Sequence, residues 1–162
     1  MKASVVLTML GTALLAACAS QPAPLQGSFN EITPQQAAAT DSTGAVVRWG
    51  GRIVGVEPQP NRTCFEMMST RLAANGRPYW AADDVGGRFI ACRTGFYDPA
   101  LFEKNREVTF TGRIGGYDTR RILGYDYRFP RVDAEVIYLW PAREYVDLVN
   151  TRPPPWPWWG YW

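Results

Sequence analysis

Between residues 45 and 143, short runs of β-branched and aromatic residues alternate with Gly, Pro, Asn and Asp, which is typical of an all-β domain. The runs predict strands at residues 46–56, 63–70, 87–93, 108–114, 125–129 and 134–140. Asp98 followed by Pro99 predicts one capped turn of helix over 99–104, just before the strand at 108. The segment therefore predicts a single small β domain.

This domain contains a partial internal repeat. Residues 47–53 (VRWGGRI) align with residues 108–114 (VTFTGRI): each copy has an aromatic residue at its third position and ends in Gly-Arg-Ile. Glycine inside a strand marks a bulge or a bend, and a small barrel needs bent strands to close. We therefore predict a closed or partly open β-barrel of the OB type, with one short helix and irregular termini. An open sandwich is the alternative.

Residues 1–17 are a predicted signal peptide, because Lys2 precedes an apolar run too short to cross a bilayer. The motif that follows, Leu15-Ala16-Ala17-Cys18, resembles the lipobox of bacterial lipoproteins. The resemblance implies cleavage before Cys18 and acylation of its thiol and of the new amine. In such lipoproteins an aspartate after the cysteine retains the protein in the inner membrane. Ala19 therefore favours a lipid-anchored protein on the periplasmic face of the outer membrane.

Residues 18–44, rich in Pro, Gln, Ala, Ser and Thr, are predicted to be a flexible tether between the lipid and the barrel. Within it, residues 32–39 are a candidate short helix with Thr33 as its cap. Removing Lys2 with the signal peptide leaves 16 basic residues (17 minus 1) against 15 acidic ones. The basic residues are scattered, so no nucleic-acid partner is expected.

Cys64 and Cys92 remain as an even pair in an oxidising compartment. Both lie in predicted strands, and folding back near Pro78 would place them opposite each other, within reach of a disulfide. Such a bond would stabilise the domain by about 3 kcal/mol, and free thiols are the alternative. No metal site is expected, because two cysteines in a chain without histidine make a poor ligand set.

Several segments of the β domain carry a resemblance to a known family. Residues 87–91 (GRFIA), 95–99 (GFYDP) and 108–112 (VTFTG) occur in the order and spacing found in the Slp family of Gram-negative outer-membrane lipoproteins. Residues 49–54 (WGGRIV) look like that family's first strand and 137–140 (IYLW) like its last. The resemblance implies an outer-membrane lipoprotein linked to starvation or stationary phase, without a known biochemical activity. The two cysteines of the β domain depart from the family pattern, so a disulfide would be a local addition.

No residue is a strong catalytic candidate and no cofactor is expected. The chain has no histidine, which excludes a Ser-His-Asp or Cys-His arrangement. It also lacks a phosphate-binding Gly-rich loop. A carbohydrate- or peptidoglycan-acting enzyme could use a pair of carboxylates, for which the candidates are Glu66, Asp83, Asp84, Asp133 and Glu135. We expect these to be ordinary solvated charges.

The C-terminal tail, residues 144–162, is rich in Pro and Trp and is the stronger candidate for contact. Tryptophan and tyrosine favour membrane interfaces, stack on sugars and dominate protein contacts. The rings could instead fold back over one end of the barrel. The candidate contact residues are Trp156, Trp158, Trp159, Tyr161 and Trp162.

These observations predict a lipid-anchored outer-membrane lipoprotein with a non-enzymatic envelope role, structural, stress-related or binding. The predicted partners are the membrane, through the N-terminal lipid, and an envelope protein or glycan. The alternatives are the carboxylate enzyme described above and an accessory subunit that presents its tail to an envelope complex.

Overall fold

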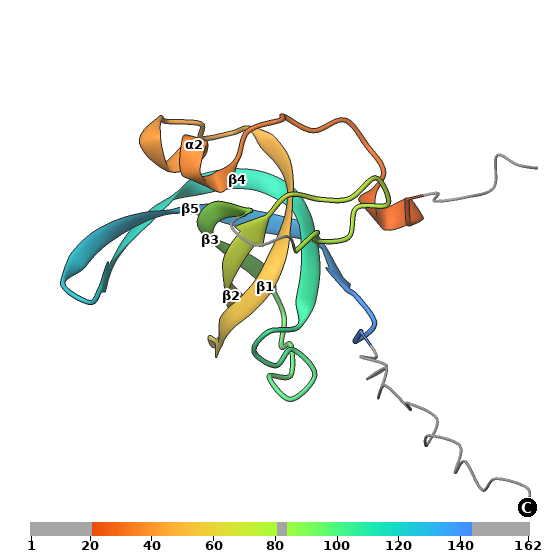
Figure 1. Cartoon of the computed structure of the whole chain (residues 1–162). Helices are drawn as coiled ribbons and strands as arrows, with labels where there is room; N and C mark the ends of the chain where they lie inside the picture. Colours follow the sequence, from red (N-terminus) through yellow and green to blue (C-terminus); the bar gives the residue numbers. More distant parts are fainter. Residues whose placement is uncertain (1–20, 81–83, 144–162) are drawn as a thin grey trace, which may run out of the picture.

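The computed structural model describes residues 21–80 and 84–143. This part of the chain forms five strands and two short helical segments (Figure 1). In chain order these are η2 (Ala23–Leu25), α2 (Pro34–Ala39), β1 (Val46–Pro58), β2 (Arg62–Thr70), β3 (Val85–Thr94), β4 (Glu107–Ile122) and β5 (Tyr125–Leu139).

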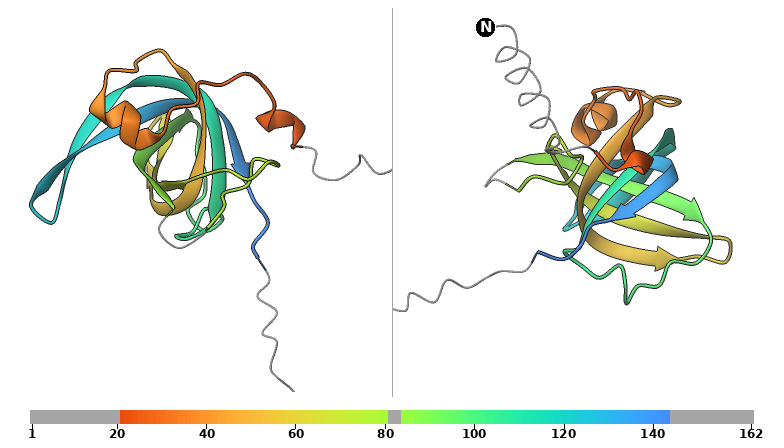
Figure 2. Two further views of the ribbon diagram at one scale, coloured as in Figure 1. Left: turned by 45° about the horizontal axis from the view of Figure 1, so that its top comes forward. Right: turned by 90° about the vertical axis from the view of Figure 1, so that its right-hand side faces the viewer.

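The five strands form one sheet that closes into a barrel in the order β1-β2-β3-β5-β4 (Figure 2). Neighbouring strands are antiparallel except β3 and β5, which are parallel over residues 90–92 and 131–133. A partly open or closed five-stranded barrel is the architecture of the OB fold. The predicted barrel is therefore confirmed, and the open sandwich is not observed.

The repeated Gly-Arg-Ile motifs mark places where the barrel strands approach too closely for a side chain. A Cβ added to Gly51 in β1 would overlap the carbonyl oxygen of Met68 in β2. A Cβ on Gly112 in β4 would overlap the carbonyl oxygen of Asp133 in β5. One register shift lies directly at Gly112, between Thr111 and Gly112, and another lies two residues after Gly51, between Ile53 and Gly55. The repeat thus identified two bends of the barrel wall.

Aromatic rings fill the barrel. The ring of Phe65 lies 5.5 Å from that of Phe110, and Phe89 makes edge contacts with Phe110 and with Trp49 at 6.0 and 5.3 Å. Phe65, Phe89 and Phe110 are essentially inaccessible to solvent. Such edge and tilted pairs contribute beyond the area they bury, about 0.5–1.5 kcal/mol each.

Segments outside the strands close both ends of this core. α2 covers one end, where Ala37 is fully buried and the Trp49 indole N–H donates to the Ile32 carbonyl at 2.7 Å. At the other end, Tyr97 and Phe102 of the β3–β4 loop pack against Phe65.

The helix before β1 is capped as predicted. The Thr33 hydroxyl accepts from the Gln36 amide at 3.1 Å, and the Gln36 side chain accepts from the Thr33 amide at 2.8 Å. This reciprocal pair is a capping box.

The single turn predicted after Asp98 forms with its cap, but residues 99–104 are not a helix. The Asp98 carbonyl accepts from the amides of Leu101 and Phe102, and its carboxylate accepts from Ala100, but the segment forms only turns. Asn105 then adopts a left-handed conformation, with φ of 68°. A single turn gains too few hydrogen bonds to offset the cost of helix nucleation, so the segment does not continue as a helix.

The prediction of six strands was also wrong, because the predicted break between residues 129 and 134 lies inside β5, and β4 extends into the predicted break between residues 114 and 125. β4 continues past Gly115 and Gly116 with a register shift, and β5 runs through Pro130 without interruption. Pro130 is tolerated because β5 pairs with β3 only from Arg131 onward, so one edge of β5 has no strand partner in the described structure at Pro130.

Residues 115–130 of β4 and β5 form a long hairpin, which we call the hairpin arm, and its end reaches well beyond the barrel (Figure 1). Leu123 at its tip is fully exposed with a φ of 49°, and Tyr125 is 70% exposed.

Residues 21–44 lie against the barrel over much of their length. Leu25 of η2 is fully buried, and the Asn30 amide bonds to the Val46 carbonyl at 2.8 Å. The packed part of the chain therefore begins well before residue 45, the expected start of the domain. None of the helices in the described residues is long and apolar enough to cross a membrane.

Candidate functional site at the barrel rim

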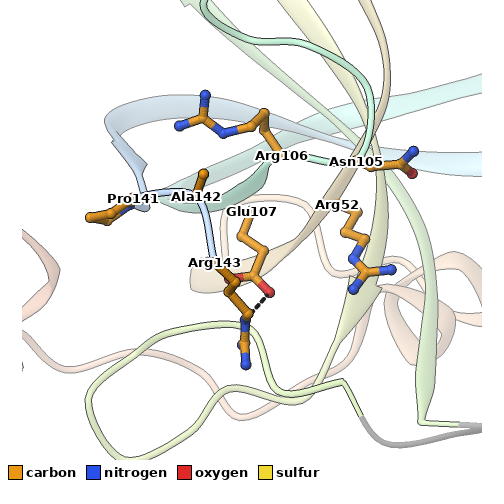
Figure 3. Close-up of a pocket in the computed structure, with 7 residues that line it drawn as sticks. All are labelled: Arg52, Asn105, Arg106, Glu107, Pro141, Ala142 and Arg143. Carbon is orange, nitrogen blue, oxygen red and sulfur yellow. Dashed lines mark hydrogen bonds and ion pairs between the residues drawn. The ribbon is translucent and has the colours of Figure 1, made fainter. Parts of the chain in front are cut away.

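A hollow of about 380 Å³ lies at one rim of the barrel, where three distant parts of the chain meet (Figure 3). Arg52 comes from β1, residues 105–107 lead into β4, and residues 141–143 follow β5. The hollow thus lies at the last described residues before the Trp-rich tail.

Glu107 is the central charge of this hollow. Its side chain is only 7% exposed. One oxygen accepts from Arg77 Nε at 2.6 Å and the other from Arg143 Nε at 2.9 Å. A buried carboxylate is tolerated when it is paired in this way, because the two guanidinium groups replace its lost hydration.

We call Arg77, Glu107 and Arg143 the rim clasp, because their side chains join three segments. A second nitrogen of Arg77 donates to the Pro141 carbonyl at 2.8 Å, and a second nitrogen of Arg143 donates to the Pro78 carbonyl at 3.1 Å. The clasp therefore fixes the 71–80 loop and the segment after β5 to the start of β4.

Buried hydrogen bonds support the clasp from below. The Trp140 indole N–H donates to the Thr109 hydroxyl at 2.9 Å, and that hydroxyl donates to the Gly76 carbonyl at 2.8 Å. Trp140 is 6% exposed, and the Arg77 guanidinium lies 5.6 Å from the centre of its ring. The end of β5 is thus held rigidly up to the residues that lead into the tail.

A second hollow of about 330 Å³ adjoins the first and shares Arg52 and Asn105 with it. The Arg52 guanidinium lies 4.1 Å from the centre of the Trp80 ring, a cation–π contact, and Lys104 lines the same hollow. The Arg106 guanidinium points away from Glu107 (Figure 3) and donates to the Trp140 carbonyl at 3.1 Å.

This arrangement does not provide a catalytic acid–base pair. Hydrolysis of a glycoside by two carboxylates requires both to face the substrate across a cleft. Glu107 is the carboxylate that lines the rim hollow, and arginines already occupy both of its oxygens.

The candidate carboxylates named from the sequence do not all lie at one site. Glu66 pairs with Arg88 at 2.8 Å, and Asp84 lies 3.2 Å from Arg71. Asp133 and Glu135 are exposed two residues apart on β5, beside a hollow of about 690 Å³ that Arg62, Arg93 and Arg113 also line. Asp83 lies outside the described residues. Within residues 21–80 and 84–143, no group of three or more potential metal ligands occurs.

Cys64 and Cys92 form a disulfide, as predicted. They are direct partners in the register of β2 and β3, with their Cα atoms 4.1 Å apart. The bond lies in a small hydrophobic cluster with Ile90 and with Phe129 of the hairpin arm.

The hairpin arm also covers part of the outer surface of β1, β2 and β3. Arg120 reaches Glu57 and Glu66 at 3.4 and 3.7 Å, and the Tyr127 hydroxyl accepts from the Arg88 amide at 3.2 Å. In OB folds the face of the second and third strands is the usual ligand surface. Here the chain's own arm occupies part of that face.

Sequence reasoning missed the rim clasp, because its residues are 30 and 36 positions apart and form no local motif. Acylation of Cys18 and the contacts of the tail residues stay predictions, since Cys18 and Trp156, Trp158, Trp159, Tyr161 and Trp162 lie outside the described residues.

Comparison with known proteins places the chain in a family. The model of the outer membrane lipoprotein Slp family matches residues 15–162, a match that includes the predicted lipobox and the whole barrel. The chain belongs to the outer membrane lipoprotein Slp family. The family expected from the sequence segments is thereby confirmed, and the protein is an outer-membrane lipoprotein.

Individual relatives agree with this assignment. The chain is 31% identical over 139 residues to the outer membrane protein Slp of Escherichia coli, covering 83% of this chain and 73% of the relative. It is 30% identical over 150 residues to an uncharacterized protein of Haemophilus influenzae, covering 87% and 80%, respectively. It is 28% identical over 149 residues to the lipoprotein YeaY of E. coli, covering 88% and 75%.

Among solved structures, a small single-stranded DNA-binding protein from Streptomyces coelicolor superimposes with a TM-score of 0.38 and 15% identity. The match covers 59% of this chain and 94% of that protein.

Proposed function

We propose that this family member acts at the periplasmic face of the outer membrane by contact and not by catalysis. In this proposal Cys18 carries the lipid, the barrel is a rigid support, and the aromatic tail is the contact element. The observation that carries the proposal is the rim clasp: the buried carboxylate at the rim binds two arginines that hold chain segments in place.

The geometry of the clasp supports a contact role for the tail. The clasp and Trp140 fix the chain up to Arg143, so the tail starts from a defined point on the barrel. Pro153, Pro154 and Pro155 remove backbone donors, so the tail cannot form an ordinary central strand. A Trp-rich segment of this kind suits an envelope protein, a glycan or the membrane interface.

A chain truncated after Arg152 tests the contact role. We expect a melting temperature within a few degrees of the full-length protein, together with a loss of recovery of envelope partners after crosslinking in cells. Burying several tryptophans would contribute about 3 kcal/mol or more each. A truncated chain that unfolds would therefore show the tail to be core and would contradict the contact role.

Cys18→Ser tests the anchor. The substitution should abolish incorporation of labelled palmitate and release the protein from outer membranes, whereas Ser20→Ala should change neither. Labelled Cys18→Ser protein in the outer-membrane fraction would contradict lipidation at this residue.

The carboxylate enzyme is tested with purified protein and peptidoglycan. We expect no soluble fragments from the wild-type protein. Fragment release that Asp133→Asn or Glu135→Gln abolishes would overturn the non-catalytic proposal, because these two exposed carboxylates line the largest of the hollows described above.

A further inference from the structure

The distance between the lipid and the folded domain is set by very few residues. The Gln21 side chain accepts from an Arg48 guanidinium nitrogen at 2.8 Å, and the same nitrogen donates to the Leu25 carbonyl at 2.9 Å. With Leu25 fully buried, these contacts fix η2 to the barrel. Three residue steps separate Gln21 from Cys18, which span at most about 11 Å when fully extended.

Three segments lie together around this fixed point. The Gly76 backbone packs against Leu25 and Gln21, where an added Cβ would lie 3.3 Å from Leu25 Cδ1. Arg77, the next residue, bonds to the Pro141 carbonyl. Figures 1 and 2 show η2, the 71–80 loop and the end of β5 on the same side of the barrel, while the tip of the hairpin arm lies on the opposite side.

We call the exposed surface of these three segments the anchor face. Small, uncharged or aromatic side chains dominate it. Its small, apolar and aromatic members include Ala23, Pro24, Ala73, Ala74, Tyr79 and Pro141, of which Tyr79 is 47% exposed.

Exposed charges of both signs border the anchor face. Arg71 is 68% exposed and lines one hollow together with the exposed Glu31, and Arg143 is 48% exposed and pairs with the buried Glu107. Asp84, the described carboxylate next to Arg71, is engaged in an ion pair with it. The tip of the hairpin arm carries a similar exposed pair, Arg121 with Asp126 at 3.1 Å, so the short reach from Cys18 and the apolar side chains, and not charge, distinguish the anchor face.

This composition suits a phospholipid surface. Tyrosine favours the headgroup region because its ring is apolar and its hydroxyl is polar. Arginine contacts phosphate groups while its methylene stem lies along apolar surface. Small apolar side chains can approach the bilayer without the cost of burying a charge.

We propose that the anchor face lies against the phospholipid leaflet that holds the N-terminal lipid, with the tip of the hairpin arm turned away from it. The inference rests on the proposed lipidation of Cys18. A domain of about 120 residues has a radius of gyration of roughly 14 Å. A reach of about 11 Å from Cys18 is therefore too short for the barrel to turn its opposite side toward the bilayer.

Single cysteines at two exposed positions test the orientation. Cys64 and Cys92 are bonded to each other, so a cysteine introduced as Ala74→Cys or Leu123→Cys supplies the free thiol of the lipidated full-length protein. Each variant is labelled with the fluorophore NBD and reconstituted in vesicles of phosphatidylethanolamine and phosphatidylglycerol. Both positions are exposed, and an unchanged melting temperature confirms that each variant is folded.

We expect NBD at position 74 to shift to the blue and to be quenched several-fold more strongly by spin-labelled lipids than NBD at position 123. Equal quenching at the two positions, or stronger quenching at 123, overturns the inference. A Gly/Ser linker of about 12 residues inserted between Cys18 and Gln21 adds a reach of roughly 20 Å. This linker should reduce quenching at 74, and unchanged quenching would show that reach does not set the orientation.

Mass spectrometry of the same samples separates the two proposals. A chain without acyl groups contradicts the proposed lipidation. A fully acylated chain with equal quenching at both positions contradicts the orientation alone.

Discussion

The close approach of strands at Gly51 and Gly112 leads to a sharp prediction for alanine substitutions. A Cβ at Gly51 would overlap the Met68 carbonyl oxygen and lie 2.9 Å from Ser69 Cα. A Cβ at Gly112 would overlap the Asp133 carbonyl oxygen and lie 2.9 Å from Ala134 Cα. In both cases the obstacle is backbone of the neighbouring strand, which cannot move aside as a flexible side chain can.

The cost follows from that obstacle. Inserting atoms into a packed region costs about 1–3 kcal/mol when side chains can adjust. Here the strands themselves must separate, which lengthens interstrand hydrogen bonds, so we expect about 3 kcal/mol or more for Gly51→Ala and for Gly112→Ala. At about 4 °C per kcal/mol for a domain of this size, each substitution should lower the melting temperature by roughly 12 °C or more.

Gly55→Ala provides a matched control in the same strand as Gly51. A Cβ at Gly55 would meet no atom within 4 Å. Thermal unfolding of the three variants, followed by circular dichroism, should leave Gly55→Ala within about 2 °C of the wild type, because the added methyl group at this partly exposed position meets no obstacle. Similar melting temperatures for Gly51→Ala and Gly55→Ala would refute the argument that strand proximity requires glycine.

Two further substitutions probe the rim and the disulfide. Glu107→Gln leaves Arg77 without its carboxylate and should lower the free energy of unfolding, measured in urea, by about 2 kcal/mol; this value is below that of a fully buried pair because the arginines are partly exposed. Glu103→Gln, at an exposed position, should be neutral, and an equal effect of the two substitutions would contradict the role of the clasp. Replacing Cys64 and Cys92 together by serine opens a loop with a sequence separation of 28 residues and should cost about 3 kcal/mol. Unchanged unfolding of that double variant in urea would show that the bond does not stabilise the fold.

Local sequence signals were sufficient to predict several parts of the structure. Thr33 was the predicted cap of a short helix, and the helix begins directly after it, at Pro34. The repeated Gly-Arg-Ile motifs predicted bent strands because only glycine allows the close approach seen at Gly51 and Gly112. The pair of cysteines predicted the register of β2 against β3, because a disulfide between two strands requires the cysteines to lie opposite each other.

Features that depend on distant contacts could not be predicted in the same way. The sequence suggests strand breaks at Gly115, Gly116 and Pro130. The strands nevertheless continue through these residues into the hairpin arm, because the pairing of β4 with β5 outweighs the local signal. Leu25 is an isolated apolar residue in a polar segment, and no local sequence pattern indicates that its side chain is buried against the barrel. For the candidate site, the carboxylate of Glu107 was not singled out, because its partners come from parts of the chain that only folding brings together.

The hairpin arm has a consequence for neighbouring copies of the protein on one membrane. Lipid anchoring confines molecules to two dimensions, where unpaired strand edges meet often and can join into intermolecular sheets. The closed barrel removes such edges from the body of the domain, but the arm extends beyond it and keeps free backbone groups along its sides. Charged side chains placed along a free edge oppose this pairing. The charged side chains of the arm are Asp118, Arg120, Arg121, Asp126 and Arg128. Arg121 and Asp126, near the tip, are 71% and 62% exposed, so crowded copies can remain separate molecules.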